Sequence, residues 1–269
     1  ALNVAQAYQN LPNNPLKSHV ENVLSLRADL APAIRGLTQI PVEANVRYYP
    51  PTRLEEWLAP NAYWFKQTAM PFLRPRGLML DGVAGTGKTG AAKYIAHMWE
   101  VPLFRLDLNL LLDKYVGESE RALQGALTGV EQFQPCIFLI DEAEKLFGSG
   151  EDSGVSKRLL AKLLYWLQEH SSSVFTISTS NALVKIPPEF YRPGRFDKVL
   201  TLEPLDLTQA KTLADELLES YLGQPFDWPK NLWQSIVSTT EETNITLTPS
   251  WVHQTLVYSL LKQSINGGA

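Results

Sequence analysis

The sequence predicts an α/β protein, with a parallel sheet flanked by helices over residues 61–204 and a small all-helical domain over residues 205–269. The first observation is an alternation, from about residue 77, of short apolar runs with stretches of helical periodicity, which is typical of parallel strands connected by helices. The second is that strand-like runs stop after Pro204. Residues 1–60 are rich in proline and asparagine, and we expect them to form an N-terminal extension or linker that packs on the main domain.

The N-terminal part carries weak structural signals, and the α/β part carries strong ones. In the former, SHVENVLSLRADL has the pattern of an amphipathic helix, and YYPPTRLEEWLAPNAYWF suggests turns with exposed aromatic side chains. Five apolar runs are the candidate strands: GLMLD, PLFRLD, CIFLID, VFTIST and KVLTLE. They are apolar on both faces, as expected for strands that helices cover on both sides of a sheet.

The C-terminal part contains three stretches with helical periodicity: LTQAKTLADELLESYL, NLWQSIVSTT and TPSWVHQTLVYSLLKQSI. Thr248 is well suited to cap the last of these helices, because Pro249 then occupies the first helical position. These stretches predict a small helical domain that follows the sheet.

Composition excludes several classes of protein. The net charge is −4, so there is no global basic field of the kind that binds nucleic acid non-specifically. Cys136 is the only cysteine, which excludes a disulfide framework and a Cys/His metal site and suits a reducing compartment. The apolar runs are too short to span a bilayer, and ALNVAQAYQN lacks the pattern of a signal peptide, so we expect a cytoplasmic location.

A glycine-rich stretch after the first candidate strand indicates a phosphate site. GVAGTGKT, from Gly82 to Thr89, fits G-x-x-x-x-G-K-[ST], follows a strand-like run and opens a helix. In such a loop the backbone N–H groups and the positive end of the helix surround phosphate oxygens. Lys88 is predicted to reach the β- and γ-phosphates, and Thr89 to bind Mg²⁺. The alternative, a glycine-rich turn with a chance lysine, is disfavoured by the flanking strand and helix.

Polar residues at the ends of two other candidate strands complete this predicted site. CIFLIDE ends in Asp141, an oxygen ligand suited to Mg²⁺, and Glu142, which can orient an attacking water molecule. Alone, these acids would be explained equally well as a cap for the next helix. Asn181 ends the VFTIST run, so we expect it at the same edge of the sheet, positioning water near the γ-phosphate. The predicted nucleotide-binding residues are Gly82, Val83, Ala84, Gly85, Thr86, Gly87, Lys88, Thr89, Gly90 and Asp141.

Two arginines lie on a turn further along the chain, in the segment IPPEFYRPGRFD. The guanidinium groups of Arg192 and Arg195 are candidates for neutralising charge that develops on a transferred phosphoryl group. Taken alone, they would be explained more simply as surface arginines that pair with Glu189 or Asp197.

At this point the chain, over about residues 75–204, resembles the AAA ATPases of the classical clade. The phosphate motif, DEAEK and YVGESERAL agree with that family, and IPPEFYRPGRFD resembles its second region of homology, a more specific signature than a phosphate loop. Within the clade, PCIFLIDEAEK, SGVSKRLLAKLLYWLQE and TPSWVHQTLVYSL look like the AAA proteins of cyanobacteria and algal plastids.

The resemblance implies a P-loop NTPase (AAA+) sheet of five strands in the order 5-1-4-3-2 with a helical lid. It also implies a homo-oligomeric ring, usually a hexamer, with ATP and Mg²⁺ bound between subunits. Asn181 would then be the sensor, and Arg192 and Arg195 would be fingers that reach the neighbour's nucleotide.

The sequence also departs from the family pattern. Val83 and Ala84 replace the usual Pro-Pro in the phosphate loop, and the usual Asp-Ile-Gly-Gly stretch upstream is absent. No arginine follows Arg195, which excludes a lid arginine at the γ-phosphate and argues against clamp-loader and initiator types. The absence of H-E-x-x-H argues against a self-contained protease.

KYVGESE, residues 114–120, is predicted to form a loop ahead of a helix that begins near Ser119. Gly117 permits a tight turn, which leaves Tyr115 and Val116 at the tip. In the family that the chain resembles, this loop faces the central channel, where such a pair can grip an extended polypeptide. The alternative is that Tyr115 packs against its own subunit.

These features predict a ring-forming ATPase that remodels a protein substrate or threads it through a central pore. A rival hypothesis is a nucleic-acid-directed motor or helicase loader with the same ATP site, and a third is a nucleotide-dependent scaffold with little turnover. Apolar and aromatic side chains in the pore favour polypeptide, whereas lysines and arginines there would favour phosphates. A protein substrate is therefore expected, nucleic acid is not indicated, and no membrane partner is expected.

Overall fold

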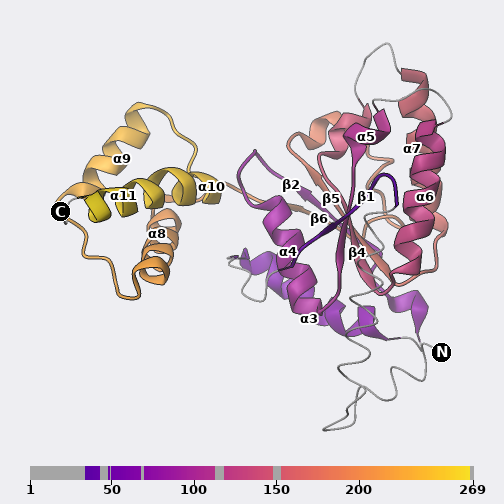
Figure 1. Cartoon of the computed structure of the whole chain (residues 1–269), viewed down its shortest axis with the longest axis horizontal. Helices are drawn as coiled ribbons and strands as arrows, with labels where there is room; N and C mark the ends of the chain where they lie inside the picture. Colours follow the sequence, from indigo (N-terminus) through magenta and orange to yellow (C-terminus); the bar gives the residue numbers. More distant parts are fainter. Residues whose placement is uncertain are drawn as a thin grey trace, which may run out of the picture.

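The computed structural model describes residues 34–42, 48, 50–67, 70–112, 118–147 and 153–266, and Figure 1 shows their arrangement. The described residues form a sheet with helices on both faces and a separate group of helices at the C-terminal end of the chain. The two parts are joined by the segment that follows the last strand.

The described residues contribute six strands to one sheet: β1 (Leu37–Ile40), β2 (Gly77–Asp81), β3 (Leu103–Leu106), β4 (Cys136–Ile140), β5 (Val174–Ser180) and β6 (Lys198–Thr201). Their order across the sheet is β1-β3-β4-β5-β2-β6. Strands β2 to β6 are mutually parallel and correspond to the five apolar runs. The predicted order 5-1-4-3-2 of these five strands is therefore confirmed.

Strand β1 was not predicted. It pairs antiparallel with β3, so that Leu37 lies opposite Leu106 and Ile40 opposite Leu103. Of its four residues only Leu37 is fully buried, so the apolar alternation is too weak to be recognised in the sequence. The strand forms because the free edge of β3 offers unpaired backbone groups.

The central strands are buried on both faces, as predicted. In β4, Cys136, Phe138 and Ile140 belong to one core cluster, whereas Ile137 and Leu139 belong to a second cluster on the other face. The helices that pack in the first cluster are α6 (Glu118–Gln132) and α7 (Ser153–Glu169), and those in the second are α3 (Thr52–Lys66) and α4 (Lys88–Trp99).

Helix α3 corrects the expectation of turns in the segment YYPPTRLEEWLAPNAYWF. It continues through Pro60, and it buries Leu54 and Phe65 completely. The ring of Phe65 stacks on Trp99 of α4 with a centroid distance of 4.9 Å. Among the aromatic residues of this segment that the structure describes, Tyr63 alone is exposed as expected, at 59%. Tertiary packing outweighs the low helix propensity that proline gives to this segment.

The helices beyond the sheet form a lid with its own apolar cluster. They are α8 (Leu207–Leu222), α9 (Leu232–Glu242), α10 (Pro249–Trp251), the π-helical turn η5 (Val252–Val257) and α11 (Tyr258–Asn266). The predicted cap is confirmed, because the Thr248 hydroxyl accepts a hydrogen bond from the backbone N–H of Trp251 at 3.2 Å. Asp206 and Gln209 form a capping box at the start of α8.

Four short elements complete the described structure: η2 (Pro71–Leu73), α5 (Leu108–Leu112), η3 (Ala143–Phe147) and η4 (Leu183–Lys185). Among the helices in the described part of the chain, none combines the length and the apolar character needed to cross a membrane.

Candidate functional site

The phosphate loop connects β2 to α4, and its shape requires glycine. Gly82, Gly85 and Gly87 have φ angles of +147°, +89° and +92°, which L side chains rarely adopt. A Cβ atom on Gly82 would lie 2.4 Å from the carbonyl oxygen of Leu202, and one on Gly85 would lie 2.8 Å from Oγ1 of Thr248. The loop is therefore a backbone cradle closed in by the lid, which fits the binding of phosphate oxygens by N–H groups.

Lys88 is folded back onto this loop. Its Nζ donates to the carbonyl oxygens of Gly82 at 2.6 Å and Val83 at 2.9 Å, and the residue is only 8% exposed. Burial lowers the pKa of Lys88, while the nearby carboxylates of Asp81 and three other acids act in the opposite direction. A phosphate group would give this ammonium charged acceptors in place of two neutral carbonyls.

The other predicted loop residues lie around the cradle. Val83 and Ala84 are exposed at its tip, and Thr86 is buried. Gly90 lies in the first turn of α4.

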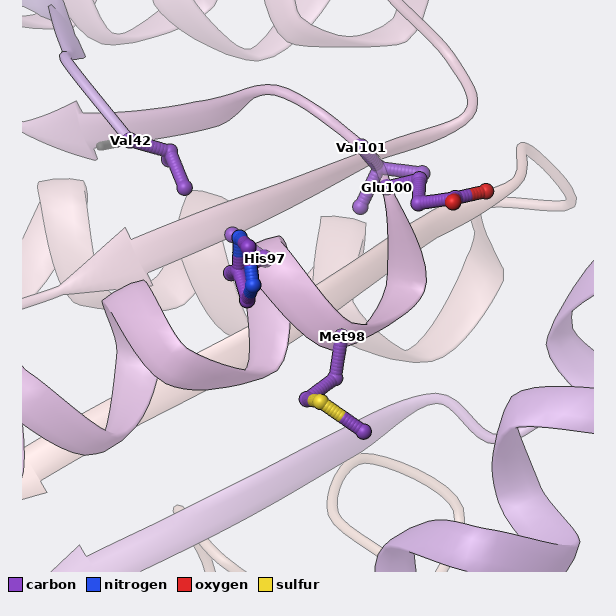
Figure 2. Close-up of a pocket in the computed structure, with 6 residues that line it drawn as sticks. Val42, His97, Met98, Glu100 and Val101 are labelled. Carbon is purple, nitrogen blue, oxygen red and sulfur yellow. The ribbon is translucent and has the colours of Figure 1, made fainter. Parts of the chain in front are cut away.

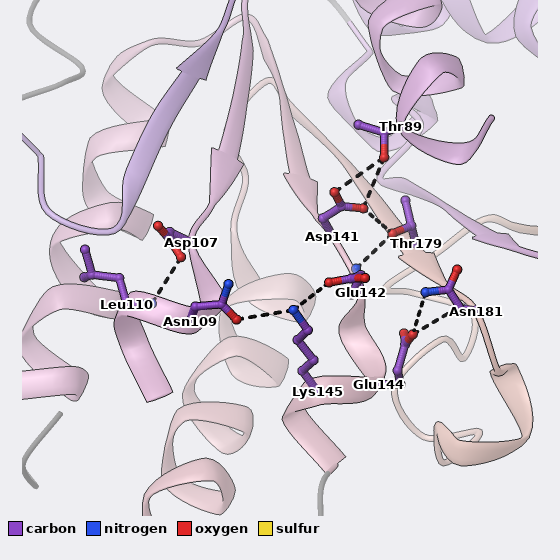
Figure 3. Close-up of polar contacts among 10 residues, drawn as sticks. All are labelled: Thr89, Asp107, Asn109, Leu110, Asp141, Glu142, Glu144, Lys145, Thr179 and Asn181. Carbon is purple, nitrogen blue, oxygen red and sulfur yellow. Dashed lines mark hydrogen bonds and ion pairs between the residues drawn. The ribbon is translucent and has the colours of Figure 1, made fainter. Parts of the chain in front are cut away.

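Asp141 and Thr89 face each other across the mouth of this site (Figure 3). Asp141 directly follows β4, and both of its carboxylate oxygens lie 3.4 Å from the Thr89 hydroxyl. Thr179 of β5 fixes the carboxylate by donating to one of its oxygens at 2.6 Å. A hydroxyl and a carboxylate are the oxygen donors that Mg²⁺ prefers, and this ion usually completes its shell with water and phosphate rather than with more protein ligands. The donor set therefore fits the predicted metal.

Glu142 adopts a left-handed backbone conformation, with φ of +53°. Its backbone N–H donates to the Thr179 hydroxyl at 2.9 Å, which helps to hold this unusual conformation. Its carboxylate is directed toward Lys145, whose Nζ lies 2.6 Å away (Figure 3).

Asn181 follows β5, at the same carboxyl edge of the sheet as Asp141. Its backbone N–H and its side-chain Nδ2 both donate to Oε1 of Glu144 at 3.1 Å (Figure 3). The other oxygen of Glu144 is buried and has no hydrogen-bond partner among the described residues. Glu144 was not among the predicted site residues, although its place three residues after Asp141 was a usable signal.

Tyr48 is a second residue that the sequence analysis missed. Its ring lies 3.2 Å from the position that a Cβ would take on Gly87 or on Gly90, so it covers the first turn of α4. It also packs against Tyr94 with a centroid distance of 5.4 Å, and burial raises its pKa. The usable signal was the pair of glycines three residues apart at a helix start, which leaves room for a ring.

The two predicted arginines are held by the chain around them. Arg195 is 8% exposed and donates to the carbonyl oxygen of Glu189 and to Oε1 of Gln168. Arg192 is more exposed, and its guanidinium lies 3.4 Å from the carboxylate of Glu189 and 3.0 Å from the same oxygen of Gln168. The simpler interpretation, pairing with Glu189, thus describes part of the Arg192 environment.

These arginines lie far from the phosphate loop of their own chain. Asp197, two residues after Arg195, accepts hydrogen bonds from the backbone N–H groups of Arg76 and Gly77, at the start of β2. The phosphate loop begins after the other end of the same five-residue strand. At about 3.3 Å per residue, the two edges of the sheet are roughly 15 Å apart.

Tyr115, Val116 and Gly117 lie outside the described residues. Helix α6 begins at Glu118, next to the predicted start at Ser119, with Glu118 and Glu120 in its first turn.

A hollow at the far end of α4 is remote from this site (Figure 2). It is lined by Val42, Ala96, His97, Met98, Glu100 and Val101. It contains neither the phosphate loop nor any predicted site residue.

Comparison with known proteins agrees with this fold. Residues 78–204 match the family model described as "ATPase family associated with various cellular activities (AAA)". The chain is 37% identical over 180 residues to an uncharacterized AAA domain-containing protein, ycf46, of Trieres chinensis, covering 65% of this chain and 36% of that protein. It is 35% identical over 136 residues to the peroxisomal ATPase PEX6 of Arthrobotrys oligospora, covering 47% of this chain and 12% of that protein.

Among solved structures, the AAA domain of FIGL-1 in complex with ADP is similar with a TM-score of 0.62 at 19% identity. The likeness covers 86% of this chain and 76% of that one. The chain spans about a third of the length of the ycf46 relative. The expected likeness to the AAA proteins of algal plastids is confirmed. Residues 78–204 of the chain therefore form a region that matches the AAA family of ATPases.

Proposed function

We propose that the chain is an ATP hydrolase that acts at the subunit interfaces of a homo-oligomeric ring, a hexamer, and uses hydrolysis to remodel or thread a protein in the cytoplasm. One observation carries the proposal. The phosphate loop, Asp141, Glu142 and Asn181 gather at the carboxyl edge of the sheet, while Arg192 is exposed at the opposite edge.

The residues at the carboxyl edge divide the chemistry among them. The loop N–H groups and Lys88 bind the phosphates, and Thr89 and Asp141 hold Mg²⁺. When bound, the ion neutralises charge on the phosphate oxygens. Glu142 orients the attacking water, and Asn181 positions it near the γ-phosphate.

The position of Arg192 supports assembly. A separation of roughly 15 Å prevents this side chain from reaching the phosphates of its own chain. Nearly half of the side chain is exposed, so a neighbouring subunit can present its nucleotide there. A ring brings the amino edge of one sheet to the carboxyl edge of the next, which completes each site with an arginine in trans.

A protein is the proposed substrate because of the sequence at residues 114–120. In the family that the chain resembles, this loop faces the channel, and here it offers a tyrosine and a valine rather than lysine or arginine. The net charge of −4 also favours a polypeptide over the phosphates of a nucleic acid.

The first experiment measures phosphate release by the wild-type chain and by Glu142→Gln in the presence of Mg²⁺. The substituted protein should bind ATP but hydrolyse it at least about 100-fold more slowly, because the water loses its orienting carboxylate. Turnover at the wild-type rate would contradict the role of Glu142. The ATP-trapped protein should also capture the substrate, and a recovered nucleic acid instead of a protein would contradict the proposed substrate class.

The second experiment distinguishes binding of the protein substrate by the predicted pore loop from ATP hydrolysis. Tyr115→Ala should keep assembly and basal ATP hydrolysis but lose substrate remodelling. Tyr165→Ala is the matched control, because Tyr165 is also a tyrosine, is 71% exposed on α7 and is not part of the predicted pore loop. Loss of ATPase activity together with thermal stability in Tyr115→Ala would show that this tyrosine packs in its own subunit.

A further inference from the structure

Glu144 is an acidic residue at the carboxyl edge of the sheet to which the proposed mechanism assigns no role. It lies in the short element η3 that follows Glu142. Its Oε1 accepts two hydrogen bonds from the same residue, one from the backbone N–H and one from Nδ2 of Asn181, each at 3.1 Å (Figure 3). One carboxylate oxygen therefore restrains both the backbone and the side chain of Asn181.

This contact fixes the direction of the Asn181 amide. A carboxylate oxygen can only accept hydrogen bonds, so the part of the amide that faces Glu144 must be its nitrogen. Figure 3 shows Nδ2 turned toward Glu144 and the amide oxygen turned away from it. Because Asn181 is an exposed residue, this oxygen is open to solvent. A water molecule can donate to it, whereas phosphate oxygens, which only accept, cannot.

The backbone around Asn181 is held by side-chain acceptors as well. The N–H of Ala182 donates to Oγ of Ser180 at 2.9 Å, and the N–H of Leu183 donates to Oδ1 of Asp81 at 3.0 Å. Together with the bond from the Asn181 N–H to Glu144, three successive N–H groups have side-chain partners. The backbone is thus fixed, and the bond from Nδ2 restrains the remaining torsions of the Asn181 side chain.

Packing does not explain why a carboxylate stands at this place. Its second oxygen, Oε2, is buried and has no hydrogen-bond partner among the described residues, which costs stability. Its charge also acts on the phosphate site. Burial lowers the pKa of Lys88, and the carboxylates of Asp81 and Glu144 are the strongest of the four that oppose this shift. An acceptor for the two N–H groups of Asn181 is the favourable interaction that Glu144 supplies.

We propose that Glu144 is a positioning residue, which holds the nitrogen of the Asn181 amide toward η3 and so presents the amide oxygen to the attacking water. This inference rests on the proposed function, in which Asn181 positions that water. Glu144 acts on the water only through Asn181. In this arrangement the amide oxygen of Asn181 accepts a hydrogen bond from the water and helps to direct it.

The restraint sets the size of the effect. Without an acceptor at residue 144, the exposed side chain of Asn181 can adopt three staggered χ1 rotamers and two orientations of its amide. The productive arrangement then falls to about one in six. Loss of Glu144 should therefore slow hydrolysis without abolishing it, and it should not weaken the binding of ATP.

The test compares steady-state phosphate release by the wild type and variants of the full chain in the presence of Mg²⁺. Glu144→Met keeps the length of the side chain but removes the acceptor, so kcat should fall by about six-fold with no increase in KM. Glu144→Gln should stay within about two-fold of the wild-type kcat, because two N–H donors face the side chain and select its amide oxygen. Adding Glu144→Met to Asn181→Ala should cause no further loss.

Glu216→Met is the matched control. Glu216 lies on α8 in the lid, and one of its carboxylate oxygens is likewise buried with no hydrogen-bond partner among the described residues. It is not one of the predicted site residues, so its replacement should leave kcat unchanged. A general effect of removing a buried carboxylate would lower kcat in both methionine variants and would overturn the specific role of Glu144.

A second readout needs no turnover. In nuclear magnetic resonance spectra of the nucleotide-free protein labelled with ¹⁵N, the side-chain amide of Asn181 is identified by its absence in Asn181→Ala. Its protons should exchange with solvent more slowly in the wild type and in Glu144→Gln than in Glu144→Met. Equal exchange in the wild type and Glu144→Met would show that the contact does not form and would overturn the proposal.

The outcomes separate this role from the proposed function. If the wild type hydrolyses ATP and Glu144→Met keeps the wild-type kcat, or Glu144→Gln loses as much as Glu144→Met, the positioning role is wrong and the proposed function stands. If neither the wild type nor any variant releases phosphate, the proposed function fails and the role of Glu144 fails with it.

Discussion

Arg192 and Arg195 are three residues apart, yet their environments predict different consequences when each is replaced by alanine. Arg195 is 8% exposed and donates to the Glu189 carbonyl and to Gln168. Its loss removes the charge-assisted hydrogen bonds that this buried guanidinium donates, which costs about 1.5–3 kcal/mol. In a chain of 269 residues this should lower the Tm by roughly 3–10 °C.

Arg192 should behave in the opposite way. Its side chain is 45% exposed and its ion pair with Glu189 is 3.4 Å long, so Arg192→Ala should cost about 1 kcal/mol or less. The same change should lower kcat by about 100-fold or more, because the phosphoryl group of the neighbouring site loses a cation. Nucleotide affinity should stay near the wild-type value, because this arginine lies at the edge of the sheet away from its own phosphate loop.

The assays are thermal unfolding, nucleotide binding and phosphate release for both variants, with mixing experiments for the action in trans. Arg192→Ala mixed with Lys88→Ala should recover partial activity, since some interfaces then combine an intact phosphate loop with an intact arginine. No recovery in assemblies shown to be mixed would refute action in trans. Equal losses of Tm for the two alanine variants would refute the argument from burial.

Four further changes follow from the described contacts. Lys88→Ala should abolish nucleotide binding, measured by titration calorimetry, because the cation at the phosphates is lost; retained affinity would contradict the site. Gly85→Ala should weaken ADP binding and cost about 1–3 kcal/mol of stability, because φ is +89° and the new Cβ would meet Thr248 at 2.8 Å; unchanged binding would show that the loop can relax. Trp99→Ala should cost about 3–5 kcal/mol in urea unfolding, since this side chain is 1% exposed, and a value well below 2 kcal/mol would contradict its place in the core. Burial lowers the pKa of His170 from 6.5 to about 4, with Arg76 adding to the effect. Between pH 6.5 and about 4, the unfolded chain binds a proton at this histidine and the folded chain does not. The free energy of unfolding should therefore fall by on the order of 3 kcal/mol as the pH drops through this range. His170→Phe should flatten this part of the profile, and an unchanged slope would assign it to other groups.

The sheet was predictable because its signals are local. The central parallel strands are apolar runs buried on both faces, and β4 shows this with all five residues buried. The edge strand β6 departs from this pattern, because only Leu200 of its four residues is buried. Strand β1 and helix α3 lacked such a signal. Strand β1 depends on pairing with the free edge of β3. Helix α3 depends on its packing in the aromatic core around Trp99, which stabilises the helix by more than Pro60 destabilises it.

Part of the site was predictable for the same reason. The glycines of the phosphate loop, Lys88 and the acids after CIFLI follow each other in the sequence, and the carboxyl ends of parallel strands meet at one edge. By contrast, Tyr48 covers Gly87 and Gly90 from a distant segment. The glycine pair indicates room for a ring, but no local pattern indicates which residue supplies it.

The sequence by itself predicted the five parallel strands and the glycine-rich loop after the first of them, because hydrophobic periodicity and glycine spacing act within a few residues. The order of these strands was implied by the resemblance to the AAA ATPases and not by any periodicity. Only the tertiary structure decided which residues these side chains contact. The contacts of Lys145 with Glu142, of Glu144 with Asn181 and of Gln168 with the two arginines have partners that the fold selects. Such contacts depend on side-chain direction and burial, and those are set by the packing of the whole sheet rather than by any local stretch of sequence.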